Sequence, residues 1–457
     1  MTAALLVAQL WTIVAVPDTQ HAAQYQALTT THIRRMVDEI NRRAPLATVQ
    51  VGDYVQNGGP ANNPEWGWMC TETDLIQTPF MVAPGNHDRD QSATTFVAFE
   101  QRVGAANSYR RIGDVAFLAL EYYCPDWALS WAIPLLEANP VPTVIVTHQW
   151  IGRGDVTASM TDFGSTLGKA DWNGTLAVWE KVVLPYPWVI GAVCGHAHGQ
   201  GFRVDTNRIG YPVFAHLANA QDDPSGGSGL HSYLSFYERE SFMLAETMSV
   251  ERGIDWSKFE VQQRTLWFPA PVGVLRWFLA RTTYHHIRSG ADTVVRGYTP
   301  SGGWGSYPEV WIHQGGVHET GLLRFDLPAR LDPSHIIYAD VTITHESSSG
   351  GATGDGYDAY RMQKPWDESS NWGNLGGIVV GRDTEATPSW TAEGIHHGLY
   401  APVTRHWDVT ADVRAWASGT PNHGWVMFGR GTDDTKLRSF DWVSLSERPL
   451  LTVAVWR

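Results

Sequence analysis

Five short apolar runs in the first half of the chain each end in a polar tip. They are "WTIVAVPD", "LATVQVGD", "PFMVAPGNHD", "PTVIVTHQW" and "WVIGAVCGHAHG", in that order. Short apolar runs bounded by turn residues are typical of buried strands. Between the first two runs, Ile33, Met36, Val37 and Ile40 have helical spacing, and the threonines before them are candidate caps. Strands that alternate with helices predict an α/β fold, in which sites gather at the carboxyl ends of strands.

The pattern changes after about residue 250. Short β-rich runs such as "DTVVRGYT", "GLLRFDLP" and "IIYADVTITHE" are then separated by Gly, Ser, Pro and Asp. This pattern predicts an all-β sandwich or jelly roll. We expect a first domain over 1–250, a closing strand and connector over 251–285, and a β domain over 286–457. The segment "FEVQQRTLWF" suits the closing strand, whereas "VGVLRWFLART" fits either a connecting helix or a first β-domain strand.

Length and charge exclude several classes of protein. A chain of 457 residues is long enough for two or three domains. Its net charge of −14 argues against generic binding to nucleic acids or anionic membranes. The apolar start lacks a basic region and is too short to span a bilayer, so Trp11–Val16 is interpreted as a buried strand. The sequence therefore shows neither a signal peptide nor a transmembrane segment.

Three cysteines, Cys70, Cys124 and Cys194, are too few for a disulfide framework. One bridge, such as Cys70–Cys124, stays open for an oxidising compartment. Buried free thiols are the simpler interpretation.

The polar tips supply residue types that hold divalent metals. The residues are Asp18, Gln20, Asp53, Asn86, His87, Asp88, His148, His196 and His198. Each motif alone is compatible with an ordinary turn, but the ordered set indicates a metal centre. In "GHAH" the two imidazoles are two residues apart, so an extended segment points both to one side. One segment can then reach two adjacent ions, and the two oxygens of Asp53 can bridge them.

This ordered set resembles the calcineurin-like metallophosphoesterase superfamily over about residues 10–250. The resemblance implies a four-layer α/β/β/α sandwich and hydrolysis of phosphate mono- or diesters by a hydroxide that bridges two metals. It implies that Asp18, Gln20, Asp53 and His198 hold the first metal and that Asp53, Asn86, His148 and His196 hold the second. His87, oriented by Asp88, would lie near the leaving oxygen without binding metal.

Two departures from the superfamily pattern bear on the metals. Gln20 stands where the superfamily usually has His, and the chain resembles a subset with this Asp-x-Gln motif. An amide oxygen is a harder and weaker ligand than imidazole, which favours Mn²⁺ or Fe and leaves Zn²⁺ or Mg²⁺ open. Tyr54 has the wrong spacing for the tyrosinate of purple acid phosphatases. The Asn-x-Gln segment of the subset places Asn219 and Gln221 near the site as substrate contacts, with a plain turn and rim loop as the alternative.

The second half resembles a DNRLRE-type, disaggregatase-related β domain, similar to carbohydrate-binding modules. The resemblance is carried by "ADTVV", "LLRFDLP", "WDESSNW" and "WDVTADVRAW". It implies adhesion to a polysaccharide or cell wall, or a scaffolding role. Trp304, Tyr307, Trp311 and Trp372 are candidate sugar platforms, and core packing is the alternative for each.

Two functions follow from these resemblances. The first is a metal-dependent phosphoesterase with a C-terminal adhesion module. The second is a non-catalytic surface or virion-associated glycan-binding protein with a vestigial phosphoesterase fold. An extracellular, virion-associated or cell-surface location is favoured, and a cytoplasmic one stays open.

Overall fold

A computed structural model describes most of the chain. The described residues are 9–89, 95–122, 124–152, 173–237, 241–251, 264–314, 318–346, 356–393, 402–431 and 435–457. They fall into two compact units. The first is drawn from 1–124, 131–164 and 174–279, and the second from 125–130, 165–173 and 280–457.

The first sheet of the first unit has six strands in the order β12-β11-β10-β1-β2-β3. The strands are β1 (Gln9–Val16), β2 (Ala47–Gln50), β3 (Phe80–Val82), β10 (His231–Tyr237), β11 (Phe242–Met248) and β12 (Arg264–Pro269). β1, β2 and β3 run parallel, and the other three pair antiparallel. β12 is the described part of the predicted closing strand, whose earlier residues lie outside the described ranges.

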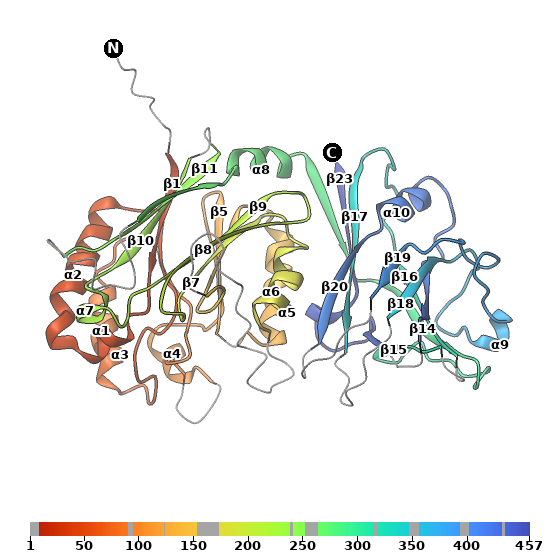
Figure 1. Cartoon of the computed structure of the whole chain (residues 1–457), viewed down its shortest axis with the longest axis horizontal. Coiled ribbons are helices and arrows are strands. Elements are labelled where there is room, and N and C mark those ends of the chain that lie inside the picture. The colour runs from red at the N-terminus through yellow and green to blue at the C-terminus, as the bar shows by residue number, and fades with distance from the viewer. Residues whose placement is uncertain are drawn as a thin grey trace, which may run out of the picture. The chain divides into compact units, whose positions relative to one another are not determined.

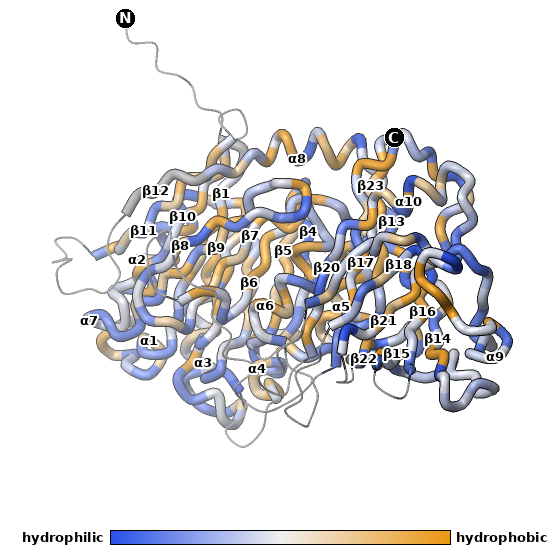
Figure 2. The backbone as a smooth tube through the Cα atoms, turned by 45° about the vertical axis from the view of Figure 1, so that its right-hand side comes forward, coloured by the Kyte–Doolittle hydropathy of each residue, from blue (hydrophilic) through white to orange (hydrophobic). Residues whose placement is uncertain are grey.

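The second sheet of the first unit has the order β4-β5-β6-β7-β9-β8. The strands are β4 (Ser108–Ile112), β5 (Val115–Leu120), β6 (Thr143–Thr147), β7 (Val189–Cys194), β8 (Gly199–Thr206) and β9 (Pro212–Asn219). β5, β6, β7 and β9 are parallel. Every residue of β5, β6 and β7 is buried, and apart from Thr143, Thr147 and Gly191 these residues are hydrophobic (Figure 2).

Helices flank both sheets (Figure 1). They are α1 (Gln20–Gln24), α2 (Gln26–Arg43), α3 (Pro64–Thr73), α4 (Val97–Arg102), α5 (Asp126–Ala138), α6 (Thr175–Val178), a π-helical turn (Trp179–Val183) and α7 (Pro224–Gly227). α2 packs Ile33, Met36, Val37 and Ile40 against Val14 of β1. The predicted threonine caps are wrong. Thr29 and Thr30 lie inside α2, where their hydroxyls donate to carbonyls four residues earlier.

The second unit contains two antiparallel sheets. One has the order β13-β23-β17-β22-β15, with β20 also paired to β17, and the other has the order β14-β16-β21-β18-β19. The strands are β13 (Thr282–Ile287), β14 (Gly290–Arg296), β15 (Glu309–Ile312), β16 (Glu319–Phe325), β17 (Ile336–His345), β18 (Tyr357–Arg361), β19 (Trp390–Ala392), β20 (Val403–Asp408), β21 (Trp425–Gly429), β22 (Thr435–Arg438) and β23 (Leu450–Trp456). One hydrophobic core, which includes Val294, Val341, Trp425 and Val453, draws residues from both sheets. This is the predicted all-β sandwich.

Three further predictions can be compared with the structure. The segment "VGVLRWFLART" contains the helix α8 (Val272–Leu279), so of the two alternatives the connecting helix is correct. The remaining helices are α9 (Trp372–Leu375), α10 (Thr410–Ala417) and a 3-10 turn (Leu445–Glu447). All three cysteines are free thiols. Within the described part of the chain, every helix is too short or too polar to cross a bilayer.

Candidate metal centre

The predicted polar tips follow strands of both sheets of the first unit. Asp18, Asp53 and Asn86 come after β1, β2 and β3, which are adjacent and parallel. His148 and His196 come after β6 and β7, which are also adjacent and parallel. The carboxyl ends of parallel strands share one edge of a sheet, so each sheet delivers its polar residues together.

Four of these side chains converge. One ligand atom each of Asp53, His148 and His196 lies within 4.8 Å of the other two. His148 Nε2 is 3.2 Å from Asp53 Oδ2 and 3.2 Å from His196 Nδ1. Asn86 Oδ1 lies 2.9 Å from His196 Nδ1 and 3.1 Å from His148 Nε2. Two imidazole nitrogens, a carboxylate oxygen and an amide oxygen therefore face one point, which is the arrangement that a divalent cation requires.

Backbone strain is concentrated at the same place. Asp53 has a φ of 49° and His196 a φ of 65°, a region that residues other than glycine seldom occupy. The Asp53 carboxylate also accepts a hydrogen bond from the backbone N–H of His87 at 2.9 Å. Such strained conformations persist where the surroundings fix them, and they cluster at functional sites.

Asp18 lies beside this cluster, with Oδ1 3.5 Å from His148 Nδ1, and both Asp18 and Gln20 are buried. Asp18 Oδ1 accepts from the backbone N–H of His196 at 3.0 Å. Asp18 Oδ2 and Gln20 Oε1 are buried, and neither has a hydrogen-bond partner among the described residues. A buried polar atom without a partner is costly, and a cation would satisfy both oxygens. The donors present therefore fit the two-metal set that the sequence implied.

His198 lies further out. Its Nε2 is 2.6 Å from the Gln221 amide nitrogen, and its Nδ1 is 2.5 Å from Asp222 Oδ2. Asn219 donates to the backbone carbonyl of His196 at 3.2 Å and accepts from the backbone N–H of Gln221 at 3.0 Å. Asn219 and Gln221 thus contact the "GHAH" segment, next to the centre, while their expected contact with substrate stays a prediction.

His87 is half-buried beside the centre, and its Nδ1 donates to the Gln56 carbonyl at 3.0 Å. Asp88 does not take the orienting role expected of it. Its two carboxylate oxygens accept instead from the backbone N–H groups of Val55 and Gly85, at 3.0 and 2.8 Å. Gly85 lies in the turn after β3 and Val55 in the segment after β2, so Asp88 links these two segments, and the Gln56 carbonyl orients the ring.

The buried carboxylates and imidazoles at the centre shift one another's pKa values. Burial, together with the nearby Asp53 carboxylate, raises the pKa of Asp18 to about 7. Burial alone would lower the pKa of His148, but the Asp53 and Asp18 carboxylates outweigh it and raise that pKa to about 9. Burial and the His148 charge lower the pKa of His196 to about 4. Burial alone would raise the pKa of Asp53, but the charge and hydrogen bond of His148 outweigh burial, and the pKa of Asp53 lies below its ordinary value. The carboxylates thus share a buried negative charge that one imidazolium compensates.

Tyr122, Asp222 and Gln56 are contacts that sequence reasoning missed. The Tyr122 ring centroid lies 5.4 Å from that of His148 and 5.1 Å from that of His196, with Oη 3.5 Å from His196 Nε2. Tyr122 follows β5, the parallel neighbour of β6, so its place at the end of an apolar run was a usable signal. Gln56 contributes a backbone carbonyl, for which the sequence carries no signal.

Comparison with known families matches residues 12–200 to calcineurin-like phosphoesterases. Residues 283–453 match carbohydrate-binding module family 96. The chain joins a calcineurin-like phosphoesterase domain to a family 96 carbohydrate-binding module. This confirms the predicted α/β and all-β fold classes and their order, although the matched module is not described as DNRLRE. No curated protein matches the chain.

Solved structures share limited similarity with the chain. GAP50, the anchor in the inner membrane complex of Plasmodium, is 12% identical with a TM-score of 0.38, over 59% of this chain and 94% of its own. Purple acid phosphatase PPD1 from yellow lupin seeds is 13% identical with a TM-score of 0.38, over 58% of this chain and 55% of its own. The protein TT1561 of Thermus thermophilus is 11% identical with a TM-score of 0.33, over 53% of this chain and 99% of its own.

Tyr54 is directed away from the metal-binding cluster. Its hydroxyl hydrogen-bonds to the Thr73 hydroxyl, and its ring lies 6.1 Å from that of Trp66 in α3. Burial raises its pKa well above the ordinary value, so the phenol stays neutral. Tyr54 therefore serves as a core residue of the phosphoesterase domain.

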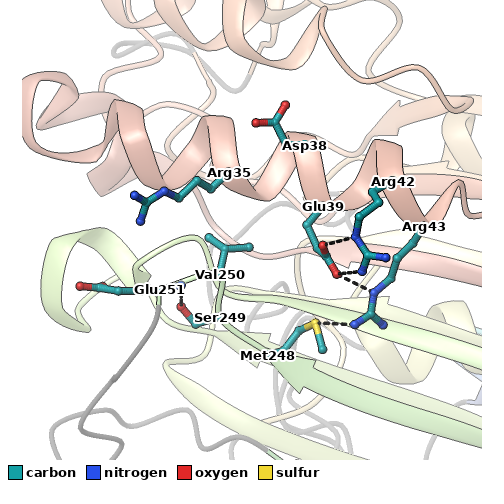
Figure 3. Close-up of a pocket in the computed structure, with 9 residues that line it drawn as sticks. All are labelled: Arg35, Asp38, Glu39, Arg42, Arg43, Met248, Ser249, Val250 and Glu251. Atoms are coloured by element: carbon teal, nitrogen blue, oxygen red, sulfur yellow. Dashed lines mark hydrogen bonds and ion pairs between the residues drawn. The ribbon is translucent and has the colours of Figure 1, made fainter.

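A surface pocket of about 810 Å³ on the phosphoesterase domain lies apart from the predicted ligands. It is lined by Arg35, Asp38, Glu39, Arg42, Arg43 and Met248–Glu251 (Figure 3). Glu39 accepts from Arg42 and Arg43 at 2.6 and 2.7 Å, so these two cations are already paired. The pocket contains none of the predicted site residues. The candidate centre is therefore identified by its converging ligand atoms and not by this pocket.

The candidate sugar platforms of the carbohydrate-binding module are partly buried. Trp304 and Trp311 pack against the sandwich core, and Trp372 packs against a second apolar cluster. The Arg296 guanidinium lies 3.9 Å from the centroid of the Trp304 ring. The ring centroid of Tyr307 lies 5.7 Å from that of Trp304, and Tyr307 is 43% exposed. The tyrosine is thus the most open member of this aromatic group.

Proposed function

We propose that the phosphoesterase domain hydrolyses phosphate mono- or diesters at a centre of two divalent cations. The observation that carries this proposal is the convergence of Asp53, Asn86, His148 and His196 on one point. The family match of residues 12–200 supports the reaction class. The unpartnered oxygens of Asp18 and Gln20 support a second cation beside the first.

The proposed metal-holding residues are those that the resemblance implies. Asp53, Asn86, His148 and His196 would hold one cation, and Asp18, Gln20, Asp53 and His198 the other. Bound cations supply Lewis acidity, which neutralises charge on phosphate oxygens and makes water a competent nucleophile near neutral pH. The amide of Gln20 in place of an imidazole favours Mn²⁺ or Fe over Zn²⁺ and leaves Mg²⁺ open.

His87 would act on the leaving group. Its Nδ1–H donates to the Gln56 carbonyl, so Nε2 is the nitrogen that exchanges a proton with substrate. The backbone N–H of His87 donates to the Asp53 carboxylate, which ties the position of the ring to the metal-binding residues. A histidine held in this way protonates the leaving oxygen as the ester bond breaks. Tyr122 lies over His148 and His196 and would shield one side of the site from water.

Hydrolysis can be tested with Mn²⁺-loaded protein on an aryl phosphate monoester and a bis-aryl phosphodiester. We expect turnover of at least one substrate, abolished by a chelator and restored by Mn²⁺. Absence of turnover on both, with two equivalents of metal bound, would favour the non-catalytic surface protein. The ratio of the two rates would assign monoester or diester preference.

We also propose that the C-terminal module binds a polysaccharide or cell-wall glycan and so brings the phosphoesterase domain to its substrate. The match to family 96 supports this role, as do the exposed aromatic rings of Tyr298 and Tyr307. An extracellular, virion-associated or cell-surface location would follow from such a partner. Glycan-array binding of the full chain should fall at least about tenfold in Tyr307→Ala, the loss of about 1.4 kcal/mol expected for a stacking contact. Tyr25→Ala, which changes a tyrosine of the other domain that is also exposed, should bind like the parent chain.

A further inference from the structure

Asp222 lies between two histidines in the turn that follows β9. Its Oδ2 is 2.5 Å from Nδ1 of His198, and its Oδ1 is 3.3 Å from Nδ1 of His21. His21 Nδ1 is also 2.9 Å from the backbone carbonyl of Gln221. The carboxylate thus joins three segments of the phosphoesterase domain: the start of α1, the turn before β8 and the turn after β9.

These contacts specify the tautomer of His198. A carboxylate accepts and does not donate, so the proton of the neutral His198 ring lies on Nδ1. The lone pair is then on Nε2, where the Gln221 amide N–H donates at 2.6 Å. Both contacts agree on one tautomer. A histidine in this state can bind a cation through Nε2 once the cation replaces the Gln221 amide there, and the carboxylate behind it increases the basicity of that nitrogen.

The other carboxylate oxygen of Asp222 contacts His21, the residue next to Gln20, which is a second proposed ligand of the first metal. His21 directly follows Gln20, whose Oε1 is buried without a partner among the described residues. Donation from His21 Nδ1 to the Gln221 carbonyl and to Asp222 anchors the first turn of α1. Gln20 and His198 come from distant parts of the sequence, and Asp222 links the segments carrying them through its two carboxylate oxygens, beside the contacts of Gln221 to the same two segments.

We propose that Asp222 is a positioning residue for the first metal position: it holds His198 with Nε2 towards the cation and fixes the α1 turn that carries Gln20. This inference rests on the proposed two-metal centre. It assigns to Asp222 no contact with substrate or cation. Loss of such a carboxylate behind a metal-binding histidine typically weakens metal affinity about 10–100-fold.

The tautomer can be measured in the metal-free parent chain. Long-range ¹H–¹⁵N correlation spectra of histidine-labelled protein report which ring nitrogen carries the proton, and His198→Gln identifies the signal. We expect His198 to carry its proton on Nδ1. A proton on Nε2 would overturn the proposal, and this measurement requires no folded Asp222 variant.

Metal binding tests the consequence. Asp222→Ala should bind one equivalent of Mn²⁺ as tightly as the parent chain and the other about 10–100-fold more weakly. Asp205→Ala is the matched control, because Asp205 pairs with Arg203 at 2.6 Å near the far end of β8. Two equivalents with parent affinity in Asp222→Ala would overturn the proposal, as would equal weakening of both. Neither readout uses turnover, so an inactive parent chain would refute the phosphoesterase function while leaving the role of Asp222 decided by these measurements.

Discussion

Gly195→Ala should damage the metal centre through a single methyl group. Gly195 connects β7 to His196, and a Cβ placed there would lie 2.9 Å from Asp18 Cγ, with Asp18 Oδ2 closer still. Carbon atoms in packed interiors normally approach to about 3.5–4.0 Å, so Asp18 would have to move by roughly 0.6–1.1 Å.

Asp18 has no room for this movement. It is 3% exposed, and its Oδ1 accepts from the backbone N–H of His196, the residue next to the new methyl. Overpacking of this kind costs about 1–3 kcal/mol of folding stability. A misplacement near 1 Å in a catalytic site can cost about 100-fold in rate. We therefore expect kcat/KM to fall about 100-fold and the first metal to bind more weakly.

The assay compares urea unfolding, Mn²⁺ stoichiometry and phosphoesterase turnover in the parent chain and Gly195→Ala. Gly67→Ala serves as control, because Gly67 is exposed in α3 with no atom within 4 Å of the added Cβ. That change should be neutral or should stabilise by up to about 1 kcal/mol through helix propensity. Parent-like stability and turnover in Gly195→Ala would refute the close approach of Asp18.

Two further predictions concern residues outside the metal-binding set. His87→Gln should lower kcat by about 10²–10⁴-fold while two equivalents of metal remain bound, and unchanged kcat would exclude proton donation by His87. Burial lowers the pKa of His216 to about 4, so the unfolded chain binds more protons than the folded chain between about pH 6.5 and 4. The stability of the fold should therefore decrease as pH falls through this window. His216→Phe should reduce that decrease by up to about 1.4 kcal/mol per pH unit in urea titrations, and an unchanged slope would show that His216 does not titrate on unfolding.

The convergence of four candidate ligands could be predicted from the sequence, because motif and strand coincide there. Asp53, Asn86, His148 and His196 each follow an apolar run, and parallel strands bring such positions to a common edge. Tyr122 also follows an apolar run, β5, so its position at the same edge could have been predicted. It was not singled out because tyrosine is not a typical metal ligand. Asp222 depends on how the turn after β9 folds back, which no local pattern encodes.

Errors in the sequence reasoning also have physical causes. Thr29 and Thr30 were expected to cap a helix, yet helix α2 begins before them and their hydroxyls find carbonyl acceptors within it. The resemblance implied that Asp88 orients His87. Its carboxylate is instead taken by two backbone N–H groups, whose positions depend on the folded turn. In the β domain, alternation predicts strands but not the long-range pairing of β13 with β23.

The central claim is that Asp53 joins two cations in one centre. Asn at this position tolerates the left-handed backbone of Asp53 and keeps its size, but its amide offers one weak oxygen in place of a bridging carboxylate. The deciding measurement is Mn²⁺ content by elemental analysis of the parent chain and Asp53→Asn, at a metal concentration that saturates the parent. We predict two equivalents in the parent chain and loss of both in the variant. Two equivalents in Asp53→Asn would contradict the bridging role.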